Sequence, residues 1–292
     1  MSPDRVRNCF TVDVEEYFQC EAFARSVTGE SWATRESRVA VGLDRVLALL
    51  ERHGIRATFF VLGWIAERHP QRIRAIAEAG HEIASHGYGH QHLSRLTPET
   101  FRDDVARSLD VLQPCAGQRL CGYRAPTFSI MRSTAWAADI LMELGLRYDS
   151  SIYPIHHDRY GVPDAPVRPF WLTSARGRIL EIPPLAATWW RLNVPVGGGG
   201  YLRLLPVRWI SAAVARANRQ GRPAVIYIHP WELDPDQPRL ACSRATRFRH
   251  YVNQHRTAAK LDMLLSRHSF GTVSDLVTAL ADDPHVPAWS LG

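Results

Sequence analysis

The stretch ATFFVLGWIAERHPQRIRAIAEAGHEIAS, residues 57–85, carries the pattern that decides the fold class. Ala57–Leu62 is a short continuous apolar run, as expected of a parallel strand that is covered on both faces. Arg72–Ala79 has helical spacing and ends at Gly80, and His81–Ser85 is again typical of a strand. Strand, helix and strand in this order predict one unit of a parallel sheet.

The same alternation continues on both sides of this unit, and it predicts an α/β fold with a parallel sheet, open or closed into a barrel. No linker divides the chain, so we expect one domain over residues 1–292, with irregular insertions at Ile155–Pro169 and Pro183–Pro206. The further expected strands are Cys9–Val14, Gly122–Ala125, Arg147–Ser151, Ile179–Ile182 and Ala224–Ile228. The further expected helices are Arg38–His53, Thr97–Leu112, Thr134–Leu144, Val207–Arg219 and Arg244–Arg267, with a short one near the C-terminus.

Composition restricts the class of protein. The 292 residues are 46% hydrophobic and 22% charged, which is typical of a globular chain large enough to bury a site. The net charge is +6, but the basic residues are scattered and almost all are arginine. No basic patch or groove-reading helix stands out, so a nucleic-acid partner is not expected.

Cysteine usage and the first residues bear on the compartment. The five cysteines are odd in number and lack CxxC spacing, which favours free thiols in a reducing compartment. Residues 1–7 contain no signal-peptide core, and no apolar run is long enough to span a bilayer. The sequence therefore predicts a cytoplasmic protein without a transmembrane segment.

Polar side chains stand at the ends of several expected strands, where ligands gather in α/β sheets. They are Asp13, Glu15, His86, His90, Arg124, Asp149 and His229. Asp13 and Glu15 share one face of an extended strand, and two carboxylates so close together favour a cation between them. By itself, such a pair is more often a solvated strand end.

Two histidines four residues apart, His86 and His90, can face one point, and neutral imidazole suits zinc and similar divalent ions. Thirteen histidines make chance pairs common, so the pair alone is a weak signal, and His92 is an alternative ligand. An anionic partner is needed, and Glu15 can supply it.

The remaining strand ends suggest catalytic groups. Arg124 can stabilise ionised Asp13, and a backbone N–H after Pro126 can bind an oxyanion. His229 follows a strongly apolar strand and, as a general acid, would need an orienting carboxylate, for which Asp149 is the candidate. Taken singly, Arg124 and His229 are more often structural.

Five segments in this order resemble the polysaccharide deacetylase family with the chitooligosaccharide-deacetylase (NodB) homology domain. They are Asp13–Glu15, Ser85–His90, Arg124–Pro126, Asp149–Tyr153 and Ile226–His229. TVDVEEYF at 11–18, the Trp189–Pro206 stretch and HPWE at 229–232 resemble the subgroup encoded beside exosortase-type exopolysaccharide clusters. The resemblance implies a distorted (β/α)7-type barrel of parallel strands.

The resemblance also implies a mechanism. Glu15, His86 and His90 would hold a divalent metal, with zinc the expected ion, and Asp13 would be the base that Arg124 keeps anionic. His229, oriented by Asp149, would protonate the leaving amine, and the N–H of Thr127 would bind the oxyanion. The implied reaction removes N-acetyl groups from amino sugars of a polysaccharide or a lipid-linked precursor, in exopolysaccharide biosynthesis or modification.

The first motif departs from the family pattern. Many members have two adjacent aspartates there, whereas this chain has Val14 at the second position, which cannot bind metal. The ligand is then expected at Glu15, with Glu16 as the alternative. Thr127 also stands where many relatives have tyrosine.

Aromatic residues and other functions complete the expectations. Trp231, beside His229, is expected to stack on a sugar, while Trp189, Trp190 and Tyr201 are equally well explained as packing residues. A metal-dependent amidohydrolase acting on a cyclic amide or imide, and an inactive glycan-binding relative, are the alternative functions.

Overall fold

The computed structural model describes residues 6–24, 26–190 and 192–292. The expectation about a signal segment concerns mainly residues 1–5, which lie outside the described residues. The strands are β1 (Asn8–Val14), β2 (Thr58–Val61), β3 (Glu82–Ser85), β4 (Gly122–Tyr123), β5 (Tyr148–Asp149), β6 (Phe170–Ser174), β7 (Gly177–Glu181), β8 (Ala186–Trp189), β9 (Leu192–Pro195), β10 (Val225–Ile228), β11 (Phe270–Gly271) and β12 (Ala288–Trp289). The helices are α1 (Val39–Arg52), α2 (Gly63–Arg68), α3 (Pro70–Glu78), α4 (Pro98–Ala116), α5 (Trp136–Glu143), α6 (Gly199–Leu204), α7 (Val207–Arg219), α8 (Arg244–Tyr251), α9 (Gln254–Leu265) and α10 (Val273–Leu280).

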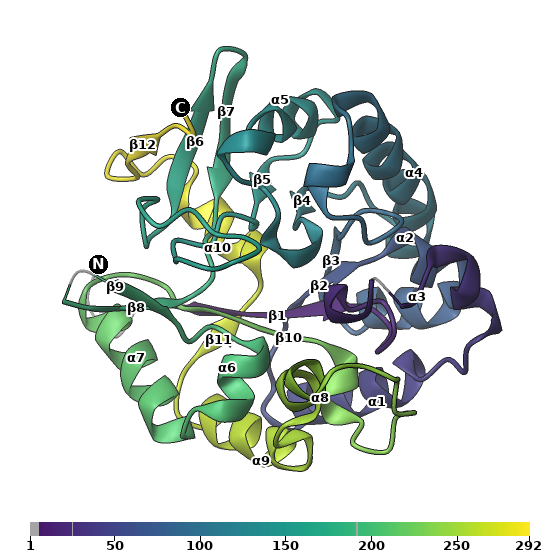
Figure 1. The fold of residues 1–292 in the computed structure, drawn as a ribbon. Helices are drawn as coiled ribbons and strands as arrows, with labels where there is room; N and C mark the ends of the chain where they lie inside the picture. The colour runs from purple at the N-terminus through teal and green to yellow at the C-terminus, as the bar shows by residue number, and fades with distance from the viewer. Residues whose placement is uncertain (1–5, 25, 191) are drawn as a thin grey trace.

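The main sheet has the order β10-β1-β2-β3-β4-β5-β7-β6-β12, and β11 also pairs with β1. The pairs from β10 to β7 are all parallel, whereas β6 pairs antiparallel with β7. Helices surround these strands (Figure 1). The predicted α/β class with parallel strands is confirmed. Within the described residues, β10 and β12 stand at the two ends of the path, so a closed barrel is not shown.

Burial of both sheet faces explains why the first strands are continuous apolar runs. Every residue of β1 and of β2 is buried, because helices cover the sheet. Helix α1 approaches the segment after β10 very closely at Gly42, where an added Cβ would lie 2.3 Å from the carbonyl oxygen of Pro230. This contact fixes the chain immediately after His229.

Two local expectations were wrong. The stretch Pro183–Pro206 is not irregular throughout, because it contains the β8–β9 hairpin and α6. The helix expected over Arg244–Arg267 is two helices, α8 and α9, separated at Asn253, which has the left-handed φ of 53°. A left-handed residue ends the run of helical backbone, and helical periodicity on either side does not reveal it.

Candidate metal and catalytic site

The polar strand-end residues lie along one edge of the sheet, because parallel neighbours present their carboxyl ends together. Asp13 and Glu15 stand at the end of β1, His86 follows β3, and Arg124 follows β4. His229 follows β10, which pairs directly with β1. The sheet order therefore brings these distant residues together, as the sequence predicts.

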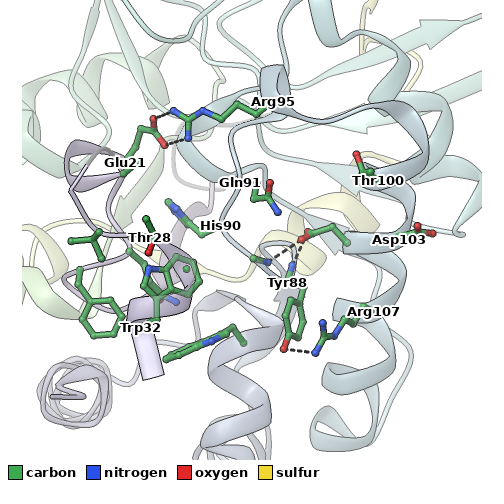
Figure 2. A pocket seen from close by; sticks show the side chains of 18 residues that line it. Glu21, Thr28, Trp32, Tyr88, His90, Gln91, Arg95, Thr100, Asp103 and Arg107 are labelled. Carbon is green, nitrogen blue, oxygen red and sulfur yellow. Dashed lines mark hydrogen bonds and ion pairs between the residues drawn. The ribbon is translucent and has the colours of Figure 1, made fainter. Parts of the chain in front are cut away.

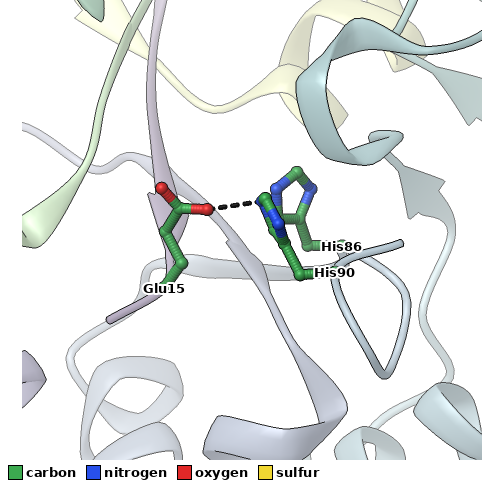
Figure 3. Close-up of side chains that lie close together, drawn as sticks. All are labelled: Glu15, His86 and His90. Atoms are coloured by element: carbon green, nitrogen blue, oxygen red, sulfur yellow. Dashed lines mark ion pairs between the residues drawn. The ribbon is translucent and has the colours of Figure 1, made fainter. Parts of the chain in front are cut away.

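Glu15, His86 and His90 form a cluster whose potential ligand atoms all lie within 4.8 Å of one another. The side chain of Glu15, at the end of β1, faces those of His86 and His90, which both come from the loop after β3 (Figure 3). His90 Nε2 lies 2.5 Å from Glu15 Oε2. Among the described residues, this is the group of His, Cys, Asp and Glu whose geometry suits a metal ion.

The loop between the two histidines is held by a residue that the sequence reasoning missed. Asp104, on α4, accepts hydrogen bonds from the backbone N–H groups of Tyr88 at 2.8 Å and Gly89 at 3.0 Å. Gly87 and His90 have left-handed φ values of 76° and 46°, so the chain turns back sharply here. Sequence spacing alone gives no signal for this distant anchor.

The protonation of the cluster fits a divalent cation. His86 Nδ1 lies 2.7 Å from the carbonyl oxygen of Arg124, which can only accept, so Nδ1 carries the proton and Nε2 has the free lone pair. Burial lowers the pKa of His86 to about 4, which keeps the ring neutral. Burial raises the pKa of Glu15, but the charges of His90 and His229 outweigh this and lower it overall. Two imidazoles and one carboxylate are a donor set for zinc or a similar ion.

The two alternative ligands lie elsewhere. Glu16 accepts the backbone N–H of Arg38 at 3.0 Å and the hydroxyl of Ser37. His92 places Nε2 at 3.1 Å from the carbonyl oxygen of Arg159, and its Nδ1 accepts from the backbone N–H of Ser94. The geometry therefore favours Glu15 with His86 and His90.

Asp13 is paired with a fully buried arginine. Arg124 Nη1 lies 2.7 Å from Asp13 Oδ1 and also 2.7 Å from the hydroxyl of Thr11. Its other nitrogens donate to the backbone carbonyl and the hydroxyl of Ser150. Arg124 is thus held on both sides, and its charge compensates that of Asp13 where both side chains are buried.

His229 lies close to the carboxylates of both Asp13 and Glu15. Its Nε2 is 3.9 Å from Asp13 Oδ2 and 3.7 Å from Glu15 Oε1, and 17% of its side chain is exposed. Burial lowers the pKa of His229, but Glu15, Glu232 and Asp13 raise it to about 9. An imidazolium between solvent and the carboxylates is placed to donate a proton.

The orienting partner of His229 is Glu232, and the expectation of Asp149 was wrong. His229 Nδ1 lies 2.8 Å from Glu232 Oε1, and the backbone N–H of His229 donates to the same oxygen. The other oxygen of Glu232 accepts from Arg203 of α6. A residue three positions along the chain reaches the ring, whereas β5, which carries Asp149, lies five strands along the sheet from β10.

Asp149 instead belongs to a buried carboxyl pair. The register of β5 and β7 places Asp149 opposite Glu181, and burial raises the pKa of Asp149 to about 6 and that of Glu181 further. Asp149 Oδ2 and Glu181 Oε2 are buried and have no hydrogen-bond partner among the described residues. Two buried carboxyl groups facing one another make the loss of both protons unfavourable.

Substituting Glu232 with glutamine is expected to lower kcat by about 10- to 100-fold with little change in bound metal, because Glu232 orients the acid but does not touch the cluster. The loss of its negative charge should also lower the pKa of His229, which can be followed by NMR titration of the metal-free protein. Glu36→Gln, on the exposed surface, is the control. An unchanged pKa of His229 with unchanged kcat would contradict this role.

Trp231 does not offer a stacking surface to a sugar, contrary to expectation. Its indole stacks on the rings of His229, at 5.0 Å between centroids, and of His250, at 4.1 Å, and only 5% of the residue is exposed. Its Nε1 donates to Glu15 Oε1 at 2.9 Å. Trp231 therefore holds the Glu15 carboxylate so that Oε2 faces His90.

The turn after β4 was expected to contact substrate. Pro126 is buried and Thr127 is half-buried with a left-handed φ of 58°. Their contact with an acetyl group stays a prediction. Tyr201 is partly buried, and Trp189 and Trp190 are exposed.

A cleft of about 600 Å³ opens beside the cluster and reaches it at His90. Its walls include Trp32, Trp64 and Tyr88, and Figure 2 shows these side chains with the ion pair of Glu21 and Arg95 at the rim. Aromatic faces beside charged groups are a common lining for polar ring-shaped ligands. The cleft was not predicted, because its walls come from several segments.

Comparison with known proteins bears on the family. The family model described as polysaccharide deacetylase matches residues 39–148, and a domain of unknown function, DUF3473, matches residues 150–278. A peptidoglycan deacetylase-like protein, FGM2, of Gibberella zeae is 34% identical over 38% of this chain and 33% of its own length. A peptidoglycan deacetylase of Helicobacter pylori is 30% identical over 40% of this chain and 39% of its own. These matches support the polysaccharide deacetylase family.

The similarity in sequence covers only part of this chain, whereas the similarity in fold covers nearly all of it. The chain matches between a third and two-fifths of the length of these two relatives. The crystal structure of Puue allantoinase superposes with a TM-score of 0.62 over 97% of this chain and 93% of that chain, at 17% identity. The similarity to this allantoinase concerns the fold alone.

Proposed function

We propose that this chain is a metal-dependent hydrolase that removes N-acetyl groups from the amino sugars of a polysaccharide. The observation that carries the proposal is the meeting of Glu15, His86 and His90 with the Asp13–Arg124 pair and His229 at one edge of the sheet. The names of the peptidoglycan deacetylase relatives support a carbohydrate deacetylase.

The side chains would divide the reaction between them. A divalent ion held by Glu15, His86 and His90 would supply Lewis acidity. Asp13 takes the proton of the attacking water, and Arg124 balances its charge. His229, protonated and oriented by Glu232, gives its proton to the leaving amine nitrogen. Acetate and a free amino sugar are the products.

The finer assignments rest on the sequence resemblance. We propose zinc as the ion, a lipid-linked or finished exopolysaccharide as substrate, and membership of the exosortase-associated subgroup. A cytoplasmic location is proposed because all five cysteines are free thiols. We also propose a single catalytic domain over residues 1–292, with Pro126 and Thr127 beside the acetyl group.

Acetate release from N-acetylglucosamine oligomers tests the proposal. We expect release that stops after chelation and returns when zinc is added. A small cyclic amide is the comparison substrate. Turnover of the cyclic amide alone would indicate the amidohydrolase alternative, and a chain that binds oligomers without metal-dependent turnover of either would indicate an inactive relative.

A further inference from the structure

The β8–β9 hairpin has its apolar face turned outward. The register pairs Trp189 with Leu192 and Ala187 with Val194, so these four side chains share one face of the ribbon. Trp189 is 70% exposed, Leu192 is 71% exposed and Val194 is 38% exposed. A two-stranded ribbon normally buries its apolar face, so this one offers an unusual apolar surface to its surroundings.

The opposite face of the hairpin pairs Thr188 with Asn193 near the tip, where Thr188 is also exposed, and Ala186 with Pro195 at the base, where both residues are buried. Thr188 donates from its hydroxyl to Asn193 Oδ1 at 2.9 Å, and Asn193 Nδ2 reaches the carbonyl oxygen of Pro163 at 3.5 Å. These hydrogen bonds join the two strands and tie the hairpin to Pro163, and the side chains of Trp189 and Leu192 at its tip are exposed. Trp190, which follows β8 directly, is 92% exposed and extends this surface.

Helix α7 contributes a basic surface on the same side of the molecule (Figure 1). Arg208, Arg216 and Arg219 are exposed, and at about 100° per residue they lie in one stripe, with Trp209, which is 65% exposed, beside them. The opposite face, with Ile210, Val214 and Ala217, is buried. The helix contains no acidic residue.

The loop over residues 155–169 contacts both the hairpin and the segment just after α7. Asn193 of the hairpin contacts Pro163, and Arg222, just after α7, donates to the carbonyl oxygen of Val167 at 2.8 Å. Arg168, on the same loop, is exposed and lies close enough to Arg222 for its charge to help lower the pKa of Arg222, after the larger effect of burial. This loop thus contacts the hairpin at Pro163 and the residue just after α7 at Val167.

We propose that the hairpin and the exposed face of α7 form a docking surface for an anionic phospholipid bilayer. Tryptophan favours the interface between headgroups and acyl chains, and arginines beside it attract anionic headgroups. A sugar stacks on one face of an indole, whereas Trp190 has nearly its whole surface free, as suits insertion. Among the described residues no helix is long and apolar enough to cross a membrane.

Sedimentation with vesicles tests this surface without any measurement of activity. The full chain is mixed with vesicles of phosphatidylcholine alone or of phosphatidylcholine and phosphatidylglycerol in equal amounts. We expect binding to the anionic vesicles, weaker binding in high salt, and at least about tenfold weaker binding when Trp189, Trp190 and Leu192 are all changed to serine. Phe248→Ser, an exposed aromatic on α8, is the matched control and should bind as the parent does.

A second variant tests the charges. The α7 variant has glutamine in place of Arg208, Arg216 and Arg219. The control variant has glutamine at three arginines that are exposed elsewhere on the protein, Arg74, Arg147 and Arg267, so that both variants lose the same net charge. Only the α7 variant should lose affinity for anionic vesicles, with circular dichroism showing that each variant is folded. Equal loss in both variants, absence of binding by the parent, or self-association through the hairpin without lipid would overturn the proposal, as would binding of an anionic polysaccharide in place of vesicles.

Discussion

Asp13→Asn is expected to lower kcat by about 10²- to 10⁴-fold while the protein keeps its full content of metal, because general bases typically contribute rate factors of this size. The amide retains an oxygen that can accept from Arg124 Nη1, now 2.7 Å from Asp13 Oδ1, but it cannot take the proton of water. Steady-state acetate release and metal analysis of the same preparation would measure the two quantities.

Stability separates this effect from simple unfolding. Loss of the Asp13 charge leaves the buried guanidinium of Arg124 without its counter-charge, which we expect to cost up to about 3 kcal/mol in the free energy of unfolding. The hydroxyl of Thr11 and the oxygens of Ser150 still accept from Arg124, so the protein should remain folded. Asp110→Asn, at an exposed position of α4, is the control. Retention of normal turnover by Asp13→Asn would remove Asp13 from the role of base.

The sheet could be predicted because its signals are local. Ala57–Leu62 and Ala224–Ile228 are apolar runs that only a doubly covered strand would carry, and β2 and β10 lie within them. Parallel pairing then places the following residues at one edge without further information. That is why residues as distant as Asp13 and His229 could be expected in one site.

Contacts between side chains could not be derived in the same way. Both Asp149 and Glu232 are carboxylates near strand ends, and only the folded chain shows that Glu232 reaches the ring of His229 while Asp149 lies opposite Glu181. Likewise, Trp231 beside His229 suggests a sugar platform, until His250 of α8 is seen to stack on it. Partners from distant segments leave no trace in local spacing.

The β8–β9 hairpin could not be predicted from the sequence for a different reason. Glycines and prolines in Pro183–Pro206 indicate an irregular segment, yet β8 and β9 pair within it because Ala186–Trp189 and Leu192–Pro195 oppose one another. The alternation of Thr188 and Trp189 contains the strand signal, but over four residues it is too short to distinguish from chance. The exposure of Trp189 and Leu192 is seen only in the folded chain.

The comparison of Glu15→Ala with Glu16→Ala is expected to separate the metal ligand from its neighbour. Glu15 Oε2 lies 2.5 Å from His90 Nε2 within the cluster, and Trp231 holds the other oxygen. Its removal should weaken metal binding by more than about 100-fold, beyond the effect typical of an outer-shell group, and abolish metal-dependent turnover. Glu16→Ala removes the carboxylate that accepts from the hydroxyl of Ser37 and from the backbone N–H of Arg38. This change should lower the free energy of unfolding by about 1–3 kcal/mol and leave the metal affinity within a few-fold. Isothermal titration with zinc and thermal unfolding of both variants measure these effects, and the reverse pattern, with metal lost only from Glu16→Ala, would show that the carboxylate ligand has been misassigned.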